Sequence, residues 1–262
     1  MIRVENLYKS FNGLEVLRGV SLEIDKGEVL ALIGMSGFGK SVLLKHIAGL
    51  MKPDRGRVLI DGEDMCHLKG KDLERMRSRF GFLFQGGALF DSLTVFENVA
   101  FPLREKTMLS DEEIKATVLS KLEQVGLAGT EHKYPAELSG GMIKRAALAR
   151  ALVRDPEIML FDEPTTGLDP IIAHTILTLI DFCHKGLNFT GIIVTHQIPR
   201  IFDIVQKVAM LHGGTILAGG SPETIASSNE PIVRQFVSGN IEEPLESRNN
   251  QTLDKTEARG MK

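Results

Sequence analysis

The sequence predicts an α/β fold built on a doubly wound parallel β-sheet. Three short stretches, at 29–33, 158–161 and 191–195, are apolar almost throughout rather than alternating, as expected for strands covered on both faces. Helical segments are predicted at 42–50, after the first strand, and at 171–185, after the second. Buried strands alternating with helices are the pattern of a parallel sheet with helices on both sides.

The segments around this core have other patterns. Residues 1–30 alternate between apolar and polar positions, which favours half-buried antiparallel strands. Residues 69–138 are expected to be helical in several pieces, with a short apolar strand at 80–84. Ser110 and Glu113 have the spacing of a capping box, so one of these helices should begin there and end near Gly126. This middle section is compatible with a separate helical lobe.

Composition excludes several classes of protein. The 262 residues are 43% hydrophobic, with 31 Lys and Arg against 34 Asp and Glu, a formal net charge of −3. Such a chain is neither collagen-like, disordered nor a disulfide scaffold. A slightly negative net charge, with both signs mixed along the chain, also argues against nucleic acid as a partner.

Targeting and redox signals point to the cytosol. No stretch approaches the roughly 20 apolar residues of a membrane-spanning helix, and residues 1–6 carry charges where a secretory signal needs an apolar segment. Cys66 and Cys183 lie far apart without metal-ligand spacing, so both are expected to be reduced. After Glu242 the chain becomes polar and aperiodic, which predicts a flexible tail.

The most specific motif is the run Gly34-Met35-Ser36-Gly37-Phe38-Gly39-Lys40-Ser41 between a predicted strand and a predicted helix. It fits G-x-x-x-x-G-K-[ST], the P-loop. Backbone N–H groups of Gly34, Ser36, Gly37 and Gly39 can converge on phosphate oxygens, and Lys40 adds a positive charge toward the β and γ phosphates. Ser41 is placed to ligate Mg²⁺. A glycine-rich turn that merely connects strand and helix is the alternative interpretation.

Two acidic residues end the strand at 158–161. Asp162 and Glu163 would lie at the carboxyl edge of the sheet, where doubly wound sheets bind ligands. We expect Asp162 to hold the magnesium ion and Glu163 to accept a proton from the attacking water or to orient it. The alternative is that these carboxylates cap the following segment.

A second glycine-flanked helix start is predicted at Leu138-Ser139-Gly140-Gly141-Met142, ahead of a helical run at 143–153. Such a helix amino terminus is suited to an anion. The chain is therefore predicted to carry two helix ends able to bind phosphate.

The order of these motifs resembles that of ATP-binding cassette (ABC) ATPases. The P-loop, Leu138-Ser139-Gly140-Gly141, Asp162-Glu163, Thr166-Gly167-Leu168-Asp169 and His196 follow one another as in that family. The resemblance implies an ABC ATPase fold: a RecA-like α/β core, an antiparallel β subdomain and a helical subdomain at about 86–155. It covers residues 1–240 and leaves 241–262 as a polar tail.

The resemblance also implies roles for single residues. Gln85 is similar to the glutamine that senses magnesium and the attacking water, and His196 to the histidine that contacts the γ-phosphate. Phe11 stands where the family stacks an aromatic ring on adenine, although it is also compatible with a core position. Asp169 is similar to the aspartate that communicates across the dimer. The helix end at 139–141 would reach the ATP of a second copy, so that two chains enclose two ATP molecules.

Two P-loop positions depart from the family pattern. Phe38 stands where a small residue is usual, and Val42 replaces a hydroxyl residue that often follows Ser41. Neither change removes a backbone donor, so nucleotide binding is expected to persist with a weaker α-phosphate contact at Val42.

Residues 84–90 and 93–105 resemble the ATPase of the Mla-type lipid transporters. This resemblance implies work on a separate integral membrane permease, association with an MCE-domain lipid-binding protein and a STAS-domain regulator, and a peripheral position at the cytoplasmic face of the bacterial inner membrane. Such systems move phospholipids between the inner and outer membranes. The alternatives are the ATPase of an importer for a small polar solute, an ABC ATPase outside transport, and a P-loop kinase.

Overall fold

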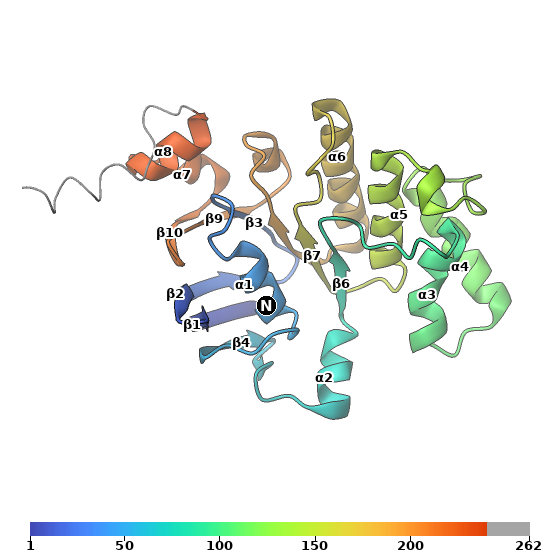
Figure 1. Cartoon of the computed structure of the whole chain (residues 1–262), viewed down its shortest axis with the longest axis horizontal. Helices are drawn as coiled ribbons and strands as arrows, with labels where there is room; N and C mark the ends of the chain where they lie inside the picture. Colours follow the sequence, from blue (N-terminus) through green and yellow to red (C-terminus); the bar gives the residue numbers. More distant parts are fainter. Residues whose placement is uncertain (240–262) are drawn as a thin grey trace, which may run out of the picture.

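The computed structural model describes residues 1–239, so the predicted tail at 241–262 lies outside the described residues. The chain forms one six-stranded and one four-stranded sheet, with helices packed around them (Figure 1). The helices α3, α4 and α5 gather at one end of the molecule, and the strands β1, β2 and β4 lie at the other side of the six-stranded sheet.

The six-stranded sheet has the order β10-β9-β3-β8-β7-β6. Its strands are parallel except for β10, which pairs antiparallel with β9. Every residue of the three central strands is buried, as their apolar sequences predict. The parallel sheet expected from sequence is therefore confirmed. The strands are β3 (Val29–Ile33), β6 (Phe80–Leu83), β7 (Ile158–Asp162), β8 (Thr190–Val194), β9 (Lys207–His212) and β10 (Thr215–Gly220).

The second sheet is antiparallel and has the order β2-β1-β4-β5. Asn12 and Gly13, both with positive φ, form the tight turn between its first two strands, as a two-residue hairpin requires. Antiparallel strands within residues 1–30 are thus confirmed, whereas β4 and β5 carried no sequence prediction. The strands are β1 (Ile2–Phe11), β2 (Leu14–Ile24), β4 (Arg55–Ile60) and β5 (Glu63–Asp64).

Helices cover both faces of the parallel sheet. Alternate residues of β3 belong to two different hydrophobic clusters: Ala31 and Ile33 face the cluster with α5 and α6, while Leu30 and Leu32 face α1 and the antiparallel sheet. Helix α4 begins at the predicted capping box of Ser110 and ends just before Gly126. The helices are α1 (Lys40–Ile47), α2 (Gly70–Arg77), α3 (Val95–Lys106), α4 (Asp111–Gln124), α5 (Gly140–Leu152), α6 (Pro170–Leu187), α7 (Pro222–Ala226) and α8 (Pro231–Ser238), with 3₁₀ turns at Pro135–Glu137 and Arg200–Asp203.

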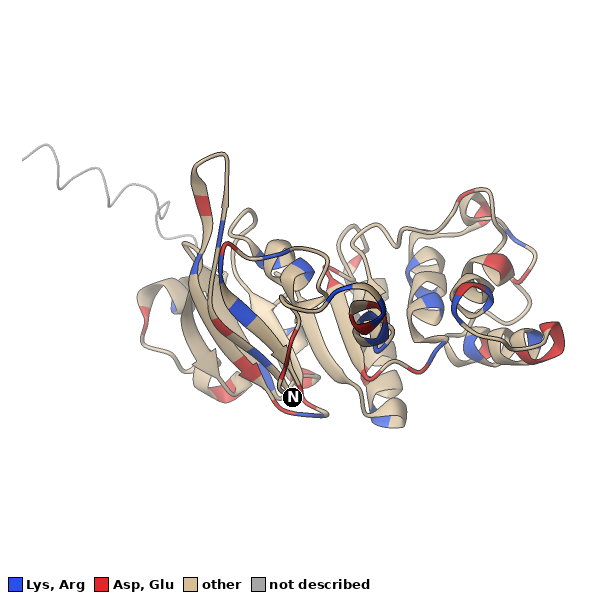
Figure 2. Ribbon diagram, turned by 90° about the horizontal axis from the view of Figure 1, so that it is seen from below, with Lys and Arg blue, Asp and Glu red and all other residues tan. Residues whose placement is uncertain are grey.

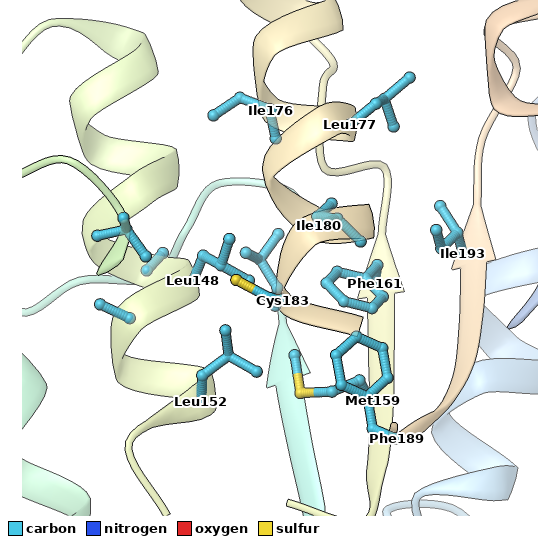
Figure 3. Close-up of a cluster of buried hydrophobic side chains, with 14 of the residues drawn as sticks. Leu148, Leu152, Met159, Phe161, Ile176, Leu177, Ile180, Cys183, Phe189 and Ile193 are labelled. Atoms are coloured by element: carbon cyan, nitrogen blue, oxygen red, sulfur yellow. The ribbon is translucent and has the colours of Figure 1, made fainter. Parts of the chain in front are cut away.

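The larger cluster fixes α6 against the sheet. In Figure 3, α6 lies between β7 and α5, with Cys183 directed toward α5 and Phe161 toward α6. The rings of Phe161 and Phe189 have centroids 6.0 Å apart. Burial raises the pKa of the Cys183 thiol to about 11, and both cysteines are free. Cys66 and Cys183 are thus not joined to each other by a disulfide.

Charge on the surface is of mixed sign. Basic and acidic residues are interspersed along the strands and helices rather than gathered on separate faces (Figure 2). Among residues 1–239, no helix combines the length and the apolar content that crossing a bilayer would need.

Asn98 of α3 ties together the segment that follows β6. Its side chain is fully buried; Nδ2 donates to the carbonyls of Phe90, Leu93 and Thr94 at 3.0 Å each, and Oδ1 accepts from the Phe90 N–H at 2.7 Å. The two N–H hydrogens are shared among three carbonyls, so one buried amide is bonded to four backbone groups of residues 90–94.

We expect Asn98→Ala to lower the free energy of unfolding by about 3 kcal/mol, because it removes a fully buried amide and takes away the partner of the Phe90 N–H and of the Leu93 carbonyl. Chemical denaturation followed by circular dichroism measures the loss. The control is Thr175→Ala, which removes an exposed hydroxyl bonded to the carbonyl of Ile171 and should change stability by less than about 0.5 kcal/mol. Equal stability of the two variants would contradict this role of Asn98.

Candidate functional site

The predicted site residues are brought together by the order of the strands. β3, β8, β7 and β6 are neighbours and parallel, so the loops that leave their carboxyl ends meet along one edge. The P-loop follows β3, His196 follows β8, Asp162 ends β7 with Glu163 directly after it, and Gln85 follows β6.

The start of the P-loop packs closely against strand β9. Gly34 has φ +142°, and a Cβ there would lie 2.2 Å from the carbonyl oxygen of Leu211, so only glycine fits. Lys40 is buried, and its Nζ donates to the carbonyls of Gly34 and Met35 at 2.7 and 2.8 Å. Burial lowers the pKa of Lys40, while the carboxylates of Glu163 and Asp162 oppose that effect. The Lys40 ammonium is thus hydrogen-bonded by backbone oxygens of its own loop.

Ser41 and Asp162 form the part of the site suited to a cation. The Ser41 hydroxyl donates to Oδ1 of Asp162 at 2.8 Å, and Asp162 is 8% exposed. Burial raises the pKa of Asp162, although the bond from Ser41 acts in the opposite direction. Residues 1–239 contain no group of three or more His, Cys, Asp or Glu arranged around a metal site. One buried carboxylate beside a hydroxyl nevertheless fits Mg²⁺, which takes few protein ligands and uses substrate phosphates and water for the rest.

Glu163 contacts His196 directly. Oε2 of Glu163 lies 2.8 Å from Nδ1 of His196 and accepts a hydrogen bond of 2.8 Å from the hydroxyl of Thr166. The backbone of Glu163 has φ +51° and donates to the carbonyl of Val194, which fixes the side chain at the edge of the sheet. Sequence reasoning assigned no individual role to Thr166, although its position three residues after Glu163 in a turn was a usable signal.

Gln85 is exposed, and its backbone carbonyl accepts a hydrogen bond from Nζ of Lys144 in α5. Sequence reasoning missed Lys144. Its position in the helix was a usable signal for burial. Lys144 lies four and eight residues before Leu148 and Leu152, which are both fully buried, so it belongs to the buried face of the helix.

Ser139, Gly140 and Gly141 lie at a different place. Ser139 caps α5 by accepting from the Met142 N–H at 3.4 Å, which confirms the predicted helix start. A Cβ added to Gly140 or Gly141 would meet Leu168 or Ile172 near the start of α6. Asp169 caps α6 by accepting from the N–H groups of Ile171 and Ile172 at 3.0 Å each.

The remaining predicted residues surround the P-loop or lie on the surface. Phe11 is 40% exposed, with the ammonium of Lys9 at 5.5 Å from its ring centroid, so the core alternative for Phe11 is wrong. The ring of Phe38 packs edge-on against that of His212, with ring centroids 5.0 Å apart. This contact accounts for a large residue at position 38 of the P-loop. Val42 packs against the hydrophobic cluster between α1 and the antiparallel sheet. Ser36 and Gly37 are exposed in the loop.

A strand, P-loop and helix combined with two carboxylates at the end of a neighbouring strand define a P-loop nucleoside triphosphatase. The sequence model of the family described as "ABC transporter" matches residues 17–166, which is more than half of the chain. The chain belongs to this family and is an ABC ATPase. A second family model, for an AAA domain, matches residues 133–203.

Three relatives illustrate the range within this family. The chain is 46% identical over 238 residues to the "Probable ribonucleotide transport ATP-binding protein mkl" of Mycobacterium leprae, covering 91% of this chain and 69% of that protein. It is 42% identical to the intermembrane phospholipid transport system ATP-binding protein MlaF of Haemophilus influenzae, with coverage of 94% and 93%. Identity to MlaF of Escherichia coli K12 is 40%, with coverage of 89% and 87%.

Solved structures agree with the fold. A dimeric ATP-binding cassette in a post-hydrolysis state, bound to ADP and Pi, superposes with a TM-score of 0.78 at 32% identity and covers 85% of this chain and 99% of its own. The cbiO1 protein of Clostridium perfringens, part of the ABC transporter complex cbiONQ, gives a TM-score of 0.79 at 30% identity, with coverage of 97% and 98%. The predicted ABC ATPase fold is confirmed.

We expect Asp162→Asn to stabilise the nucleotide-free protein. A carboxyl group whose pKa is raised on folding destabilises the folded state at pH values where it is ionised, and the neutral amide removes that term while its oxygen still accepts from Ser41. Thermal unfolding at pH 7 without nucleotide measures the shift. The variant should at the same time lose most of the stabilisation that magnesium and ATP give. The control is Asp181→Asn at a surface ion pair with Lys185; an Asp162→Asn variant no more stable than this control would contradict the prediction.

Proposed function

We propose that this chain hydrolyses ATP to energise phospholipid transport through a separate permease. One observation carries the ATPase part: Lys40, Ser41, Asp162, Glu163 and His196 lie along one edge of the sheet, with direct Ser41–Asp162 and Glu163–His196 contacts. The similarity to MlaF over nearly the whole of both chains supports the phospholipid part.

Each residue has a chemical task in this proposal. Backbone N–H groups of the P-loop and the Lys40 ammonium hold the phosphates, with Gly34, Ser36, Gly37, Gly39 and Val42 shaping the loop around them. Ser41, Asp162 and Gln85 are assigned to Mg²⁺, which when bound neutralises charge on the phosphates. Phe11, exposed at the end of its strand, is assigned to the adenine ring.

Glu163 is the proton acceptor for the attacking water. Thr166 and His196 both contact Oε2, which leaves Oε1 as the oxygen that takes the proton. Nδ1 of His196 donates to the carboxylate, so Nε2 is the ring atom directed to the γ-phosphate. The side chain of His196 is 48% exposed and therefore accessible to a nucleotide.

The active unit is a dimer of two copies. Ser139, Gly140 and Gly141 lie beside the start of α6, and in our proposal they bind the ATP held by the second chain's P-loop, with Asp169 at the same boundary. The dimeric form of the related cassette bound to ADP and Pi supports this arrangement. The ABC ATPase domain then comprises residues 1–240, with a helical subdomain at about 86–155.

The partner that moves the lipid is an integral membrane permease. Phe84, Phe90 and Phe101 are large exposed side chains near Gln85 in sequence, with 37 to 43% of their surface accessible. We assign them to the permease contact, since exposed aromatic groups mark interaction surfaces. The full assembly would add an MCE-domain protein and a STAS-domain regulator and hold the ATPase at the cytoplasmic face of the inner membrane.

A second candidate is an importer of a polar solute. The 46% identity to the mycobacterial protein named for ribonucleotide transport favours it. The two candidates share the ATPase chemistry and differ only in the permease and its cargo.

Glu163→Gln should bind ATP with nearly unchanged affinity and hydrolyse it about 100-fold more slowly or worse, because the amide cannot accept the proton while the phosphate contacts remain. It should also accumulate as an ATP-bound dimer. Phosphate release, ATP binding and size-exclusion chromatography measure the three effects. Glu157→Gln, a change at a surface partner of Arg79, is the control, and hydrolysis at the control's rate would remove Glu163 from this role.

The cargo is tested by purifying the chain with its membrane partners from detergent-solubilised native membranes. We expect a permease together with an MCE-domain protein, and phospholipid retained on the complex. A permease without an MCE-domain protein, whose ATPase activity rises with a ribonucleoside or another polar solute, would replace the lipid proposal with the importer.

A further inference from the structure

Two cations of α5 hold the turn that begins at Gln85. Lys144 donates through Nζ to the carbonyl of Gln85. Arg150 donates through Nη1 to the carbonyl of Ala88 at 2.7 Å and through Nη2 to that of Gly87 at 2.8 Å. Three carbonyls in four residues are therefore bonded to one helix.

The turn also packs closely on this helix. Gly87 has φ +78°, and a Cβ there would lie 3.2 Å from Cγ2 of Ile143 and 3.4 Å from Cβ of Ala147. Its N–H donates to the carbonyl of Phe84 at 2.8 Å, which closes the turn. The backbone that carries Gln85 is thus fastened to α5 by both polar and apolar contacts.

Lys144 occupies a special position among these contacts. It is 6% exposed although it is a lysine, and such a charge is costly to bury without partners. Burial lowers the pKa of Lys144, and the negative charge of Glu163 opposes this effect. The ammonium therefore lies within the electrostatic field of the proposed proton acceptor while it holds the glutamine turn.

We propose that Lys144 is a positioning residue for ATP hydrolysis: its bond to the Gln85 carbonyl fixes the place of the glutamine side chain relative to Glu163. Lys144 lies one helical turn after Gly140, so the same bond joins the Gln85 turn to the helix end that carries Ser139. A displacement of either is transmitted to the other. This inference rests on the roles proposed above for Gln85 and Glu163.

Arg150 has a complementary part. Its guanidinium lies 5.9 Å from the ring centroid of Phe90, and Phe90 in turn packs on Phe101 with centroids 5.0 Å apart. Arg150 thus joins the far end of the turn to the exposed aromatic side chains, whereas Lys144 joins the near end to the site of hydrolysis.

The test is steady-state ATP hydrolysis by the full chain carrying Lys144→Met, which keeps the length of the side chain and removes the charged donor. We expect kcat to fall about tenfold or more, as expected for loss of a charge-assisted hydrogen bond, with the dissociation constant for ATP within about twofold of the original. Lys144→Arg, which can still donate to the carbonyl, should recover most of kcat. An unchanged kcat in Lys144→Met overturns the inference.

The matched control is Lys121→Met. Lys121 of α4 has a side chain that is 12% exposed and paired with Asp155 at 2.6 Å, so its loss also removes a largely covered lysine. It should leave kcat unchanged. Should Lys144→Met fail to fold, Lys144→Gln takes its place, because its amide keeps a neutral donor. We expect its kcat to lie between that of Lys144→Arg and that of Gln85→Ala. A kcat equal to that of the original chain overturns the inference.

A double-mutant cycle separates positioning from general structural support. If Lys144 acts through Gln85, the fall in kcat caused by Lys144→Met largely disappears in a Gln85→Ala background, because the side chain that it positions is absent. An equal fall in both backgrounds overturns the inference. Glu163→Gln distinguishes failure of the proposed function from failure of the positioning role. If Glu163→Gln hydrolyses ATP at nearly the original rate, the proposed function is wrong. If Glu163→Gln is inactive and Lys144→Met is fully active, only the positioning role of Lys144 is wrong.

Discussion

The burial of opposite charges at the carboxyl edge of a parallel sheet is the constraint on which this structure depends. Lys40 and Asp162 are both more than nine-tenths buried, and neither has an oppositely charged hydrogen-bond partner of its own. Lys40 is bonded to carbonyls of its own loop, and Asp162 to a single hydroxyl. Buried ions with so few partners are unfavourable in isolation; in the proposed function a phosphate group and Mg²⁺ would supply the charge that each lacks.

The strand order creates this edge from distant parts of the chain. β3 and β8 are adjacent although about 160 residues separate Val29 from its partner Gly191. The sequence could predict that Gly34–Ser41 and Asp162-Glu163 bind a nucleotide because each motif is local and contains its own chemistry. The buried strands and the capping box at Ser110 were predictable for the same reason, since burial on both faces and cap geometry leave local patterns.

Contacts between motifs were not predictable in this way. The bond of Lys144 to the Gln85 carbonyl joins residues 59 apart in sequence and depends on how α5 is placed after folding. β4 and β5 belong to a sheet whose pairing is non-local, and a short edge strand such as Glu63–Asp64 has no apolar run to reveal it. Phe11 was ambiguous from sequence because a phenylalanine at a strand end suits a core as well as a ring-stacking surface, and only its exposure decided between the two.

Asp169 has a structural role at the start of α6 and a proposed role in the dimer. The resemblance to ABC ATPases assigns it to communication across the dimer, whereas the structure makes it the cap of α6. Both capping bonds, from Ile171 and Ile172, are accepted by Oδ1, so Oδ2 is not needed for the cap. In the proposed dimer Oδ2 would be available to the second chain, and a rearrangement there would act on α6, which packs between β7 and α5. In that proposed dimer, the cap would link the boundary to α6 and, through the packing of α6, to the strand that ends in Asp162.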